Sequence, residues 1–324
     1  MEVFKKVKIY DFVKYSLYGL ILSTLLCVAS IVLIVVKDFK LGIDFAGGSI
    51  VQIQYTQLQK APIQEIRDIL SKDERFKGFQ VSEFGEPNEV LLKLPEFGES
   101  SKQVAQIIQS LLTSTGEFEI RRDNTISGKV GDEFKKKGAI SIVLALVAMM
   151  VYISFRYEWR FSLAGICTLA HDVVIVSGIV IIADIDFNLE VLAALLTLIG
   201  YSINDIIIIF DRIREQMLSK RMNDMNFVIN EAVSATLSRT ILTSVTVFLV
   251  VLTLYLFGGD IIKGFSLPML AGVLIATYSS MFVAPRLAIV FGFSLEKYYQ
   301  KELEKKKRAQ EKERLRAMYE NGRV

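Results

Sequence analysis

Six apolar stretches, each close to the length that crosses a lipid bilayer, dominate this sequence. Such a stretch needs about 20 residues, because an α-helix rises about 1.5 Å per residue and the hydrocarbon core is about 30 Å thick. The chain has 324 residues, of which 52% are hydrophobic, more than a soluble domain requires. The predicted transmembrane segments are residues 15–36, 138–155, 162–183, 189–210, 240–257 and 266–290. The sequence therefore predicts a polytopic α-helical membrane protein with six transmembrane helices.

The placement of Lys and Arg predicts how these helices are oriented. Basic residues gather in segments 1–14, 156–161, 211–238 and 291–324, whereas loops 184–188 and 258–264 contain only Lys263. By the positive-inside rule, both termini are predicted to be cytoplasmic and residues 37–137 extracytoplasmic. The cluster Lys135–Lys137 argues against this orientation. It ends a long segment, however, and long domains cross the membrane largely regardless of their charge.

Residues 37–137 have the composition of a soluble domain. Alternating apolar residues predict strands, and a helical period of apolar residues predicts two helices. The expected strands are 49–55, 79–84, 89–94 and 117–122, and the expected helices are 63–70 and 100–112. The order β-α-β-β-α-β is that of the ferredoxin-like α+β pattern.

Two further segments lie between or after the spans. Residues 211–238 interleave charged and apolar side chains, which predicts a short amphipathic helix on the inner membrane surface. Residues 291–324 are rich in Lys, Arg and Glu and predict a charged cytoplasmic tail, either a solvated helix or a contact to anionic lipid or a partner.

One carboxylate, Asp205, falls inside the fourth apolar stretch. A charged side chain at mid-membrane costs roughly 3 kcal/mol on insertion scales, and such residues commonly bind or relay ions. Asp205 shares a helix face with Tyr201 and Ser202. The neighbouring Asn204 is expected to form hydrogen bonds between helices.

Arg239, at the start of the fifth stretch, is the expected partner of Asp205. Both lie near the predicted cytoplasmic side, and an ion pair would offset part of the desolvation cost of each charge. Thr243 and Thr246 follow Arg239 at helical spacing and form a polar stripe with it. Two interpretations stay open at this point: a site that binds and releases an ion, and a static ion pair that fixes helix packing.

The only histidine of the chain, His171, precedes Asp172 within the third stretch. The pair is a candidate relay element, although a hydrogen-bonded core histidine fits equally well. Both cysteines lie within spans and are expected to pack there, and a single histidine provides no Cys/His metal-site spacing.

Several motifs resemble the SecF family of bacterial protein-export proteins. They are Leu41–Gly48, Arg156–Phe161, Gly200–Asp205 with Phe210–Glu215, Ser238–Thr240, Phe257–Gly259, Thr277–Ser280 and Val283–Pro285. The resemblance covers residues 11–291 and implies the transmembrane fold of resistance-nodulation-division transporters. It implies location in the bacterial inner membrane, a SecD-like subunit as heterodimer partner, action beside the SecYEG channel and an unfolded preprotein as substrate.

The resemblance also implies a role for the charged residues. The family uses the proton-motive force, and its matching Asp and Arg are implicated in proton conduction, which points to Asp205 and Arg239. A similar His-Asp pair lies where this chain has His171 and Asp172. No enzyme activity, cofactor or nucleic-acid partner is implied, and Na⁺ remains an alternative to H⁺.

Two other functions remain open on the sequence. One is half of an ion-coupled small-molecule transporter, because six spans are half of the usual twelve and transporter sites commonly lie between repeats. The other is a structural stabiliser of the export channel that conducts no ion.

Overall fold

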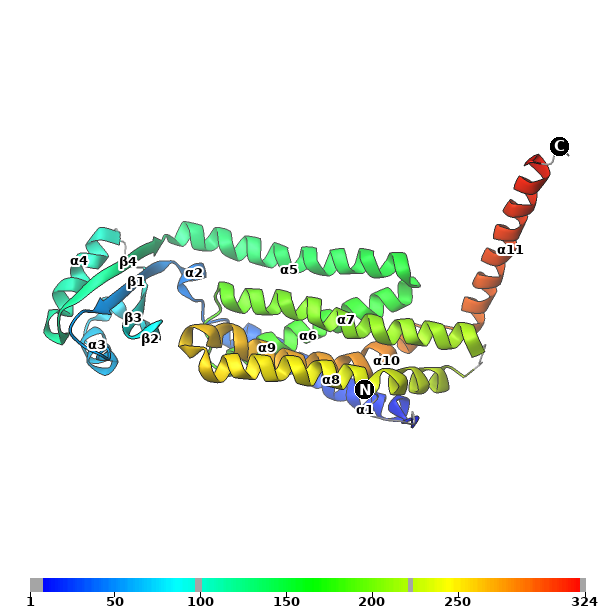
Figure 1. The fold of residues 1–324 in the computed structure, drawn as a ribbon, viewed down its shortest axis with the longest axis horizontal. Coiled ribbons are helices and arrows are strands. Elements are labelled where there is room, and N and C mark those ends of the chain that lie inside the picture. The colour runs from blue at the N-terminus through cyan, green and yellow to red at the C-terminus, as the bar shows by residue number, and fades with distance from the viewer. Residues whose placement is uncertain (1–7, 97–100, 221–223, 321–324) are drawn as a thin grey trace.

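The computed structural model describes residues 8–96, 101–220 and 224–320. Figure 1 shows an elongated molecule in which long helices run side by side, with a small α+β domain at one end of the bundle. Within the described residues, six helical spans are long and apolar enough to cross a membrane, which confirms the predicted fold class. The helices are α1 (Phe12–Lys37), α5 (Gly128–Arg156), α6 (Trp159–Ile182), α7 (Leu189–Lys220), α8 (Met225–Phe257) and α9 (Gly259–Phe282), which α10 (Ala284–Val290) continues.

Three of these helices form the centre of the bundle and three lie at its edge. In their most apolar windows, 61, 56 and 50% of the residues of α6, α7 and the α9–α10 span are buried, against 11, 11 and 17% in α1, α5 and α8. The helix α9 packs against α6, α7 and α8. The outer helices therefore present apolar surface that this chain does not cover.

The sequence predicted that residues 211–238 form a separate amphipathic helix on the membrane surface. The structure shows no such separate helix in the described part of this segment. Its two halves extend α7 to Lys220 and begin α8 at Met225. Several apolar side chains of the segment, among them Met217 and Val228, are at most 1% exposed and belong to the protein core, whereas Leu218 is exposed. An apolar stripe of helical period is the same whether protein or membrane covers it, so the pattern alone could not distinguish the two.

Two other helix boundaries differ from the predicted ones. The helix α5 begins at Gly128, ten residues before the predicted span, so the lysine cluster Lys135–Lys137 lies on its first turns. Lys135 and Lys137 form ion pairs there with Asp132 and Glu133. The sixth span is interrupted at Val283, where α9 ends and α10 begins with a proline in its first turn.

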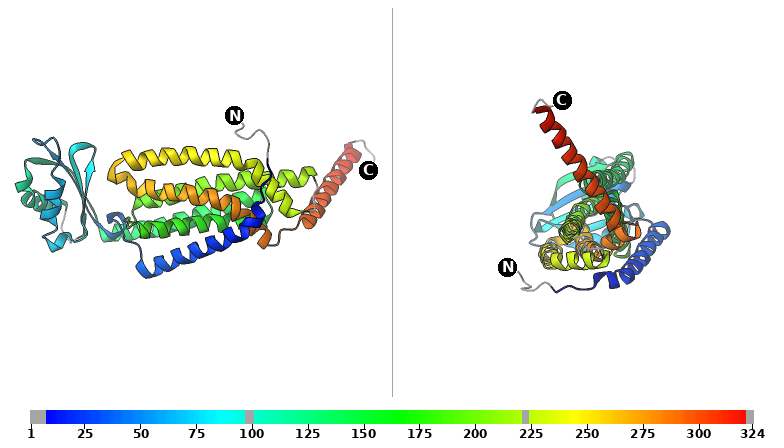
Figure 2. Two further views of the ribbon diagram at one scale, coloured as in Figure 1. Left: turned by 90° about the horizontal axis from the view of Figure 1, so that it is seen from below. Right: turned by 90° about the vertical axis from the view of Figure 1, so that its right-hand side faces the viewer.

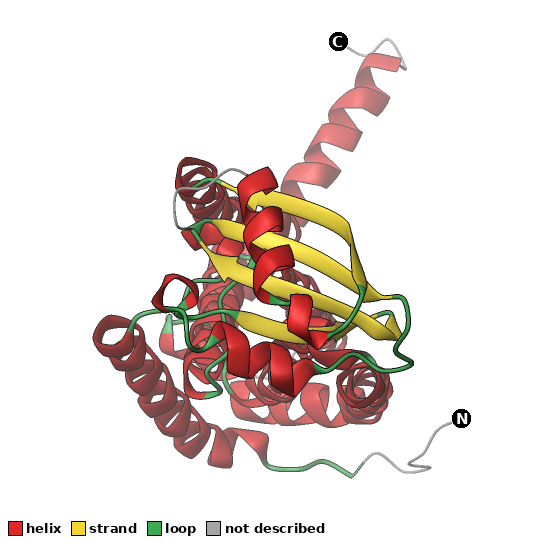
Figure 3. Cartoon of the chain, turned by 90° about the vertical axis from the view of Figure 1, so that its left-hand side faces the viewer, coloured by secondary structure: helices red, strands yellow, loops and turns green. Residues whose placement is uncertain are grey.

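The α+β domain has the predicted order of elements. Its strands are β1 (Gly48–Tyr55), β2 (Gln80–Phe84), β3 (Glu86–Pro95) and β4 (Phe118–Ile126), in an antiparallel sheet of order β2-β3-β1-β4. The helices α3 (Ile63–Leu70) and α4 (Ser101–Leu111) cover the face of the sheet that points away from the bundle (Figure 3). Short 3₁₀ turns lie at Glu74–Phe76 and Thr113–Thr115. This is the split ferredoxin-like arrangement.

The turn between β2 and β3 is tighter than the sequence predicted. Gly85 alone separates the two strands and has a φ of 68°, a conformation that favours glycine. Pro87 and Asn88, which were expected in the turn, lie within β3.

The domain is fastened to the loop that joins α6 and α7. The short helix α2 (Ile43–Ala46) follows a parallel bridge between Leu41 and Phe187, and the Gly42 amide donates to the Phe187 carbonyl (2.8 Å). The Asp44 carboxylate accepts from the Leu189 amide at the first residue of α7 (3.1 Å). The base of the domain is therefore attached to the connection between two central helices.

Charged groups reinforce this attachment. Lys40 forms ion pairs with Asp186 (3.1 Å) and Asp184 (3.7 Å), and Gln80 of β2 donates to Asp186. Burial alone would lower the pKa of the Lys40 ammonium, but the two aspartates outweigh burial and raise it. The lysine is therefore charged at neutral pH and holds the loop against the domain.

Backbone geometry at the first strand requires glycine. Gly47 and Gly48 have φ values of 86° and 152°, where the chain turns from α2 into β1. A side chain at Gly131 of α5 would collide with the Phe45 carbonyl, so α5 and α2 pack with their backbones close together.

The tail forms one long helix, α11 (Leu295–Glu320), which leaves the bundle at the end opposite the domain (Figures 1 and 2). Its start is anchored, because Leu295 is buried and the Tyr299 hydroxyl donates to the Met217 carbonyl (2.9 Å). Beyond this point the described side chains are mainly exposed and charged.

Candidate functional site

Two aspartates are buried inside the helix bundle. Asp205 on α7 and Asp172 on α6 are each only 1% exposed. A carboxylate removed from water costs several kcal/mol unless hydrogen bonds or an opposite charge compensate it. The contacts of each carboxylate therefore indicate what it can do.

Asp205 has no compensation by hydrogen bonds. Neither of its carboxylate oxygens has a hydrogen-bond partner among the described residues. Ser202 and Tyr201, which the sequence placed on the same helix face, both bond to other groups. A fully buried carboxylate without donors is suited to binding a proton or a cation, since either neutralises the charge.

Arg239 lies on α8, near enough to attract Asp205 electrostatically but without an ion pair to it among the described contacts. Arg239 is exposed in this chain, as is Thr246, while Thr243 is partly buried. The Thr246 hydroxyl donates to the Thr243 carbonyl (2.8 Å). The predicted polar stripe thus exists, but much of it faces away from the protein core. Contact between Asp205 and Arg239 stays a prediction.

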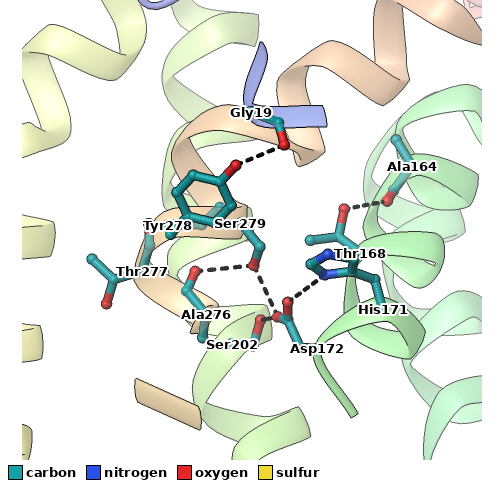
Figure 4. Close-up of polar contacts among 11 residues, drawn as sticks. Gly19, Ala164, Thr168, His171, Asp172, Ser202, Ala276, Thr277, Tyr278 and Ser279 are labelled. Atoms are coloured by element: carbon teal, nitrogen blue, oxygen red, sulfur yellow. Dashed lines mark hydrogen bonds and ion pairs between the residues drawn. The ribbon is translucent and has the colours of Figure 1, made fainter. Parts of the chain in front are cut away.

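Asp172, in contrast, is surrounded by donors (Figure 4). Its Oδ1 lies 2.9 Å from His171 Nδ1. Its Oδ2 accepts from the Ser202 hydroxyl of α7 (2.6 Å) and from the Ser279 hydroxyl of α9 (3.0 Å). An ionised carboxylate only accepts, so with Asp172 ionised the Nδ1 atom carries the histidine proton in this contact. The three bonds join all three central helices at one point.

The histidine of this group is itself only half satisfied. His171 Nε2 is buried and has no partner in the described part of the chain, while Nδ1 faces Asp172. The structure thus brings the two neighbouring residues of the candidate relay pair into direct contact.

A second hydroxyl cluster connects α7, α8 and α9. The Tyr201 hydroxyl donates to Ser244 (3.0 Å), and the Thr277 hydroxyl donates to the same oxygen (2.7 Å). Next to it, Tyr278 donates to the Gly19 carbonyl of α1 (2.7 Å), as Figure 4 shows. Tyr201 therefore lies in a bonded network beside Asp205.

Residue-by-residue reasoning missed Ser244, Thr277 and Ser279 as members of these clusters. Their signal is small hydroxyl residues inside apolar spans, which favour contacts between helices in membranes. Asn204 shows the reverse, because the sequence predicted a bond between helices and the structure leaves this side chain exposed.

A third polar cluster lies at the tail end of the bundle. Asp211 of α7 accepts from Arg156 (2.5 Å) and from the Tyr157 hydroxyl (2.6 Å). Burial, followed by the bond to Asp211, raises the pKa of Tyr157. Tyr157 is 9% exposed and packs edge-on against Phe210, whereas Trp159 is exposed.

Known proteins match this chain over its whole length. Residues 106–294 match a family described as protein export membrane protein SecD/SecF, C-terminal, and residues 32–57 match the SecD/SecF GG motif. The chain is 55% identical to protein translocase subunit SecF of Helicobacter pylori over all of both chains. It is 37% identical to SecF of Escherichia coli O157:H7 over 92% of this chain and 93% of that one. The chain belongs to the SecF family.

Solved structures of relatives agree with this assignment. The crystal structure of SecDF from Thermus thermophilus, described as a translocon-associated membrane protein, has a TM-score of 0.73 and 29% identity over 88% of this SecF chain. SecDF in a super-membrane-facing form has a TM-score of 0.68 and 28% identity over 93%. The chain spans about two fifths of those SecDF chains, since 39 and 40% of their lengths are covered.

Proposed function

We propose that this chain is the SecF subunit of a bacterial protein-export complex and that it couples ion movement through Asp205 to export. Membership in a family of translocase subunits supports the first part. The observation that carries the second part is the buried carboxylate of Asp205 without a hydrogen-bond donor. Burial of such a carboxylate costs free energy, and the binding of a proton or a cation there would explain why the chain has it.

A SecD-like subunit is the expected partner. The matched SecDF chains are more than twice as long as this chain, which supports a second, SecD-like half in the complex. The outer helix α8 also supports a partner subunit, because Arg239 and Thr246 lie on its exposed face. A partner helix over this face would enclose Arg239 and complete the surroundings of Asp205. The SecYEG channel and an unfolded preprotein follow from the family alone.

The coupling of ion binding to helix movement follows from the change in charge at Asp205. Ion binding at Asp205 removes an unpaired buried charge, and release restores it, with Arg239 favouring the charged form. Moving one charge across 100 mV supplies about 2.3 kcal/mol, enough to bias a two-state movement of packed helices. We propose both termini in the cytoplasm and the α+β domain on the opposite side of the bacterial inner membrane.

The α6–α7 loop offers the route from this site to the outer domain. Asp172 and Asp205 lie on the two helices that the loop joins, and the loop is fastened to the domain through Phe187 and Asp186. The domain would therefore move together with the ends of α6 and α7. A moving domain could hold and release an exported chain.

The test is ion flux through the complex with its SecD-like partner in proteoliposomes. We expect Asp205→Asn to assemble normally and to lose voltage-driven flux and the stimulation of export, and Arg239→Met to lose most of both. Varying pH at constant Na⁺, and Na⁺ at constant pH, identifies the ion. Normal flux and export by Asp205→Asn at full membrane potential would contradict the proposal and favour a non-conducting stabiliser.

A further inference from the structure

The acceptor capacity of Asp172 is largely used by neighbours from three helices. Ser202 and Ser279 share Oδ2, and His171 occupies Oδ1. Three of the roughly four acceptor sites of the carboxylate are therefore occupied. Asp172 is therefore poorly suited to taking up and releasing an ion.

Asp172 is well placed to act on Asp205 instead. Ser202 precedes Asp205 by three residues on α7, and residues three apart lie on the same helix face. The Asp172–Ser202 bond at 2.6 Å thus fixes the rotation and depth of α7 one turn away from the unpartnered carboxylate. The bond from Ser279 fixes α9 at the same point.

We propose that Asp172 is a positioning residue: it holds α7 through Ser202 so that Asp205 keeps its place relative to Arg239, and it carries no ion itself. This inference rests on the proposed ion role of Asp205. His171 belongs to the same device, because its Nδ1–H orients the Asp172 carboxylate. A relay would require the charge of Asp172, whereas a positioning role requires only its hydrogen bonds.

The Asp172→Asn and Asp172→Ala variants separate the two roles. An amide keeps the shape of the carboxylate, and its NH₂ group donates to serine hydroxyls that can rotate to accept. In the reconstituted complex we expect Asp172→Asn to keep ion flux within about threefold of wild type, whereas Asp172→Ala loses about tenfold or more. Equal loss in both variants, with assembly intact, would overturn the positioning role.

If Asp172→Ala does not assemble, variants that each remove one hydroxyl group still test the positioning role. Ser202→Ala is expected to lower flux about tenfold, because it releases the helix that carries Asp205. Ser279→Ala removes a bond to the same oxygen on another helix and should cost no more than about threefold. Thr168→Ala is the matched control, since among the described residues its hydroxyl bonds only to the Ala164 carbonyl of its own helix (2.8 Å).

Failure of this inference can be told apart from failure of the proposed function. If Asp205→Asn conducts normally, the ion role is wrong and the positioning role falls with it. If Asp205→Asn is inactive and Ser202→Ala is fully active, the ion role stands and the positioning role is wrong. Restoration of flux by Ser202→Thr, with equal thermal stability in Ser202→Ala and Thr168→Ala, would support positioning over a general packing role.

Discussion

Asp172 and Asp205 lie on adjacent helices and are equally buried, yet their surroundings are opposite. Asp172 accepts from a histidine and two serines, while Asp205 has no hydrogen-bond donor among the described residues. Burial alone therefore does not identify the residue that binds an ion. The supply of donors distinguishes the two residues, because most buried polar groups in proteins are hydrogen-bonded and an exception calls for an explanation.

The two aspartates are also expected to differ in their effect on the stability of the fold. The bonds of Asp172 join α6, α7 and α9 and are expected to stabilise the bundle. Asp205 stabilises nothing that the structure describes and is expected to weaken the fold. A protein retains such a group where a strained or unsatisfied site serves its function.

The largest effect on stability is expected for Asp172→Ala. It removes the acceptor of three hydrogen bonds and leaves buried hydroxyl and imidazole donors unpaired, at a cost of about 3–5 kcal/mol. Thermal unfolding of the purified protein, followed by loss of helical circular dichroism, measures the change. Thr168→Ala serves as the control. An unfolding temperature of Asp172→Ala equal to that of the control would contradict the claim that the hydrogen bonds of Asp172 stabilise the bundle.

Asp205→Leu is expected to act in the opposite direction. The side chain keeps its branched shape and loses an unsatisfied polar group, which should stabilise the fold by about 1–3 kcal/mol while abolishing ion flux. The unfolding temperature should rise above that of wild type under the same conditions. A clear fall would mean that Asp205 has a stabilising partner after all.

Much of the fold could be predicted from the sequence, because its determinants are local. Span lengths and turn residues gave the six spans, and alternating apolar residues gave the order of elements in the domain. Boundaries were less certain. The helix α5 begins ten residues early because its charged first turns, with ion pairs such as Lys137–Glu133, continue the helix beyond the apolar stretch.

The site was only partly predictable, because its partners are distant in sequence. A charge inside an apolar span identifies Asp205 and Asp172 directly. Which of them has donors depends on residues such as Ser279, which is 107 positions away from Asp172. The exposure of Arg239 likewise depends on the direction in which α8 faces, which the period of its apolar residues does not fix.

Asp211 provides an intermediate case between the two buried aspartates, because it is satisfied but partly exposed. Tyr157→Phe removes a hydroxyl that donates to it at 2.6 Å and should cost about 1–2 kcal/mol, less than Asp172→Ala, because water can replace the lost donor. The same thermal unfolding measures it. A cost as large as that of Asp172→Ala would show that exposure does not weaken such contacts in this bundle.

The smallest effect on stability is expected at Asp73 in the outer domain, a partly exposed aspartate whose donors come from the largely exposed Arg75 two residues away. Hydrogen bonds from the Arg75 side chain and then from its amide lower the pKa of Asp73. The pKa of Asp73 is therefore lower in the folded protein than in the unfolded chain. The contribution of Asp73 to the stability of the fold is present above the unfolded-state pKa of about 4 and is lost as pH falls through the folded-state pKa.

Asp73→Asn should leave stability at pH 7 nearly unchanged, because exposed ion pairs contribute little. Unfolding temperatures of Asp73→Asn and wild type, compared from pH 7 down to pH 3, should differ slightly at pH 7 and converge in acid. A large loss at pH 7 would mean that donors stabilise a carboxylate as strongly at the surface as they do at Asp172.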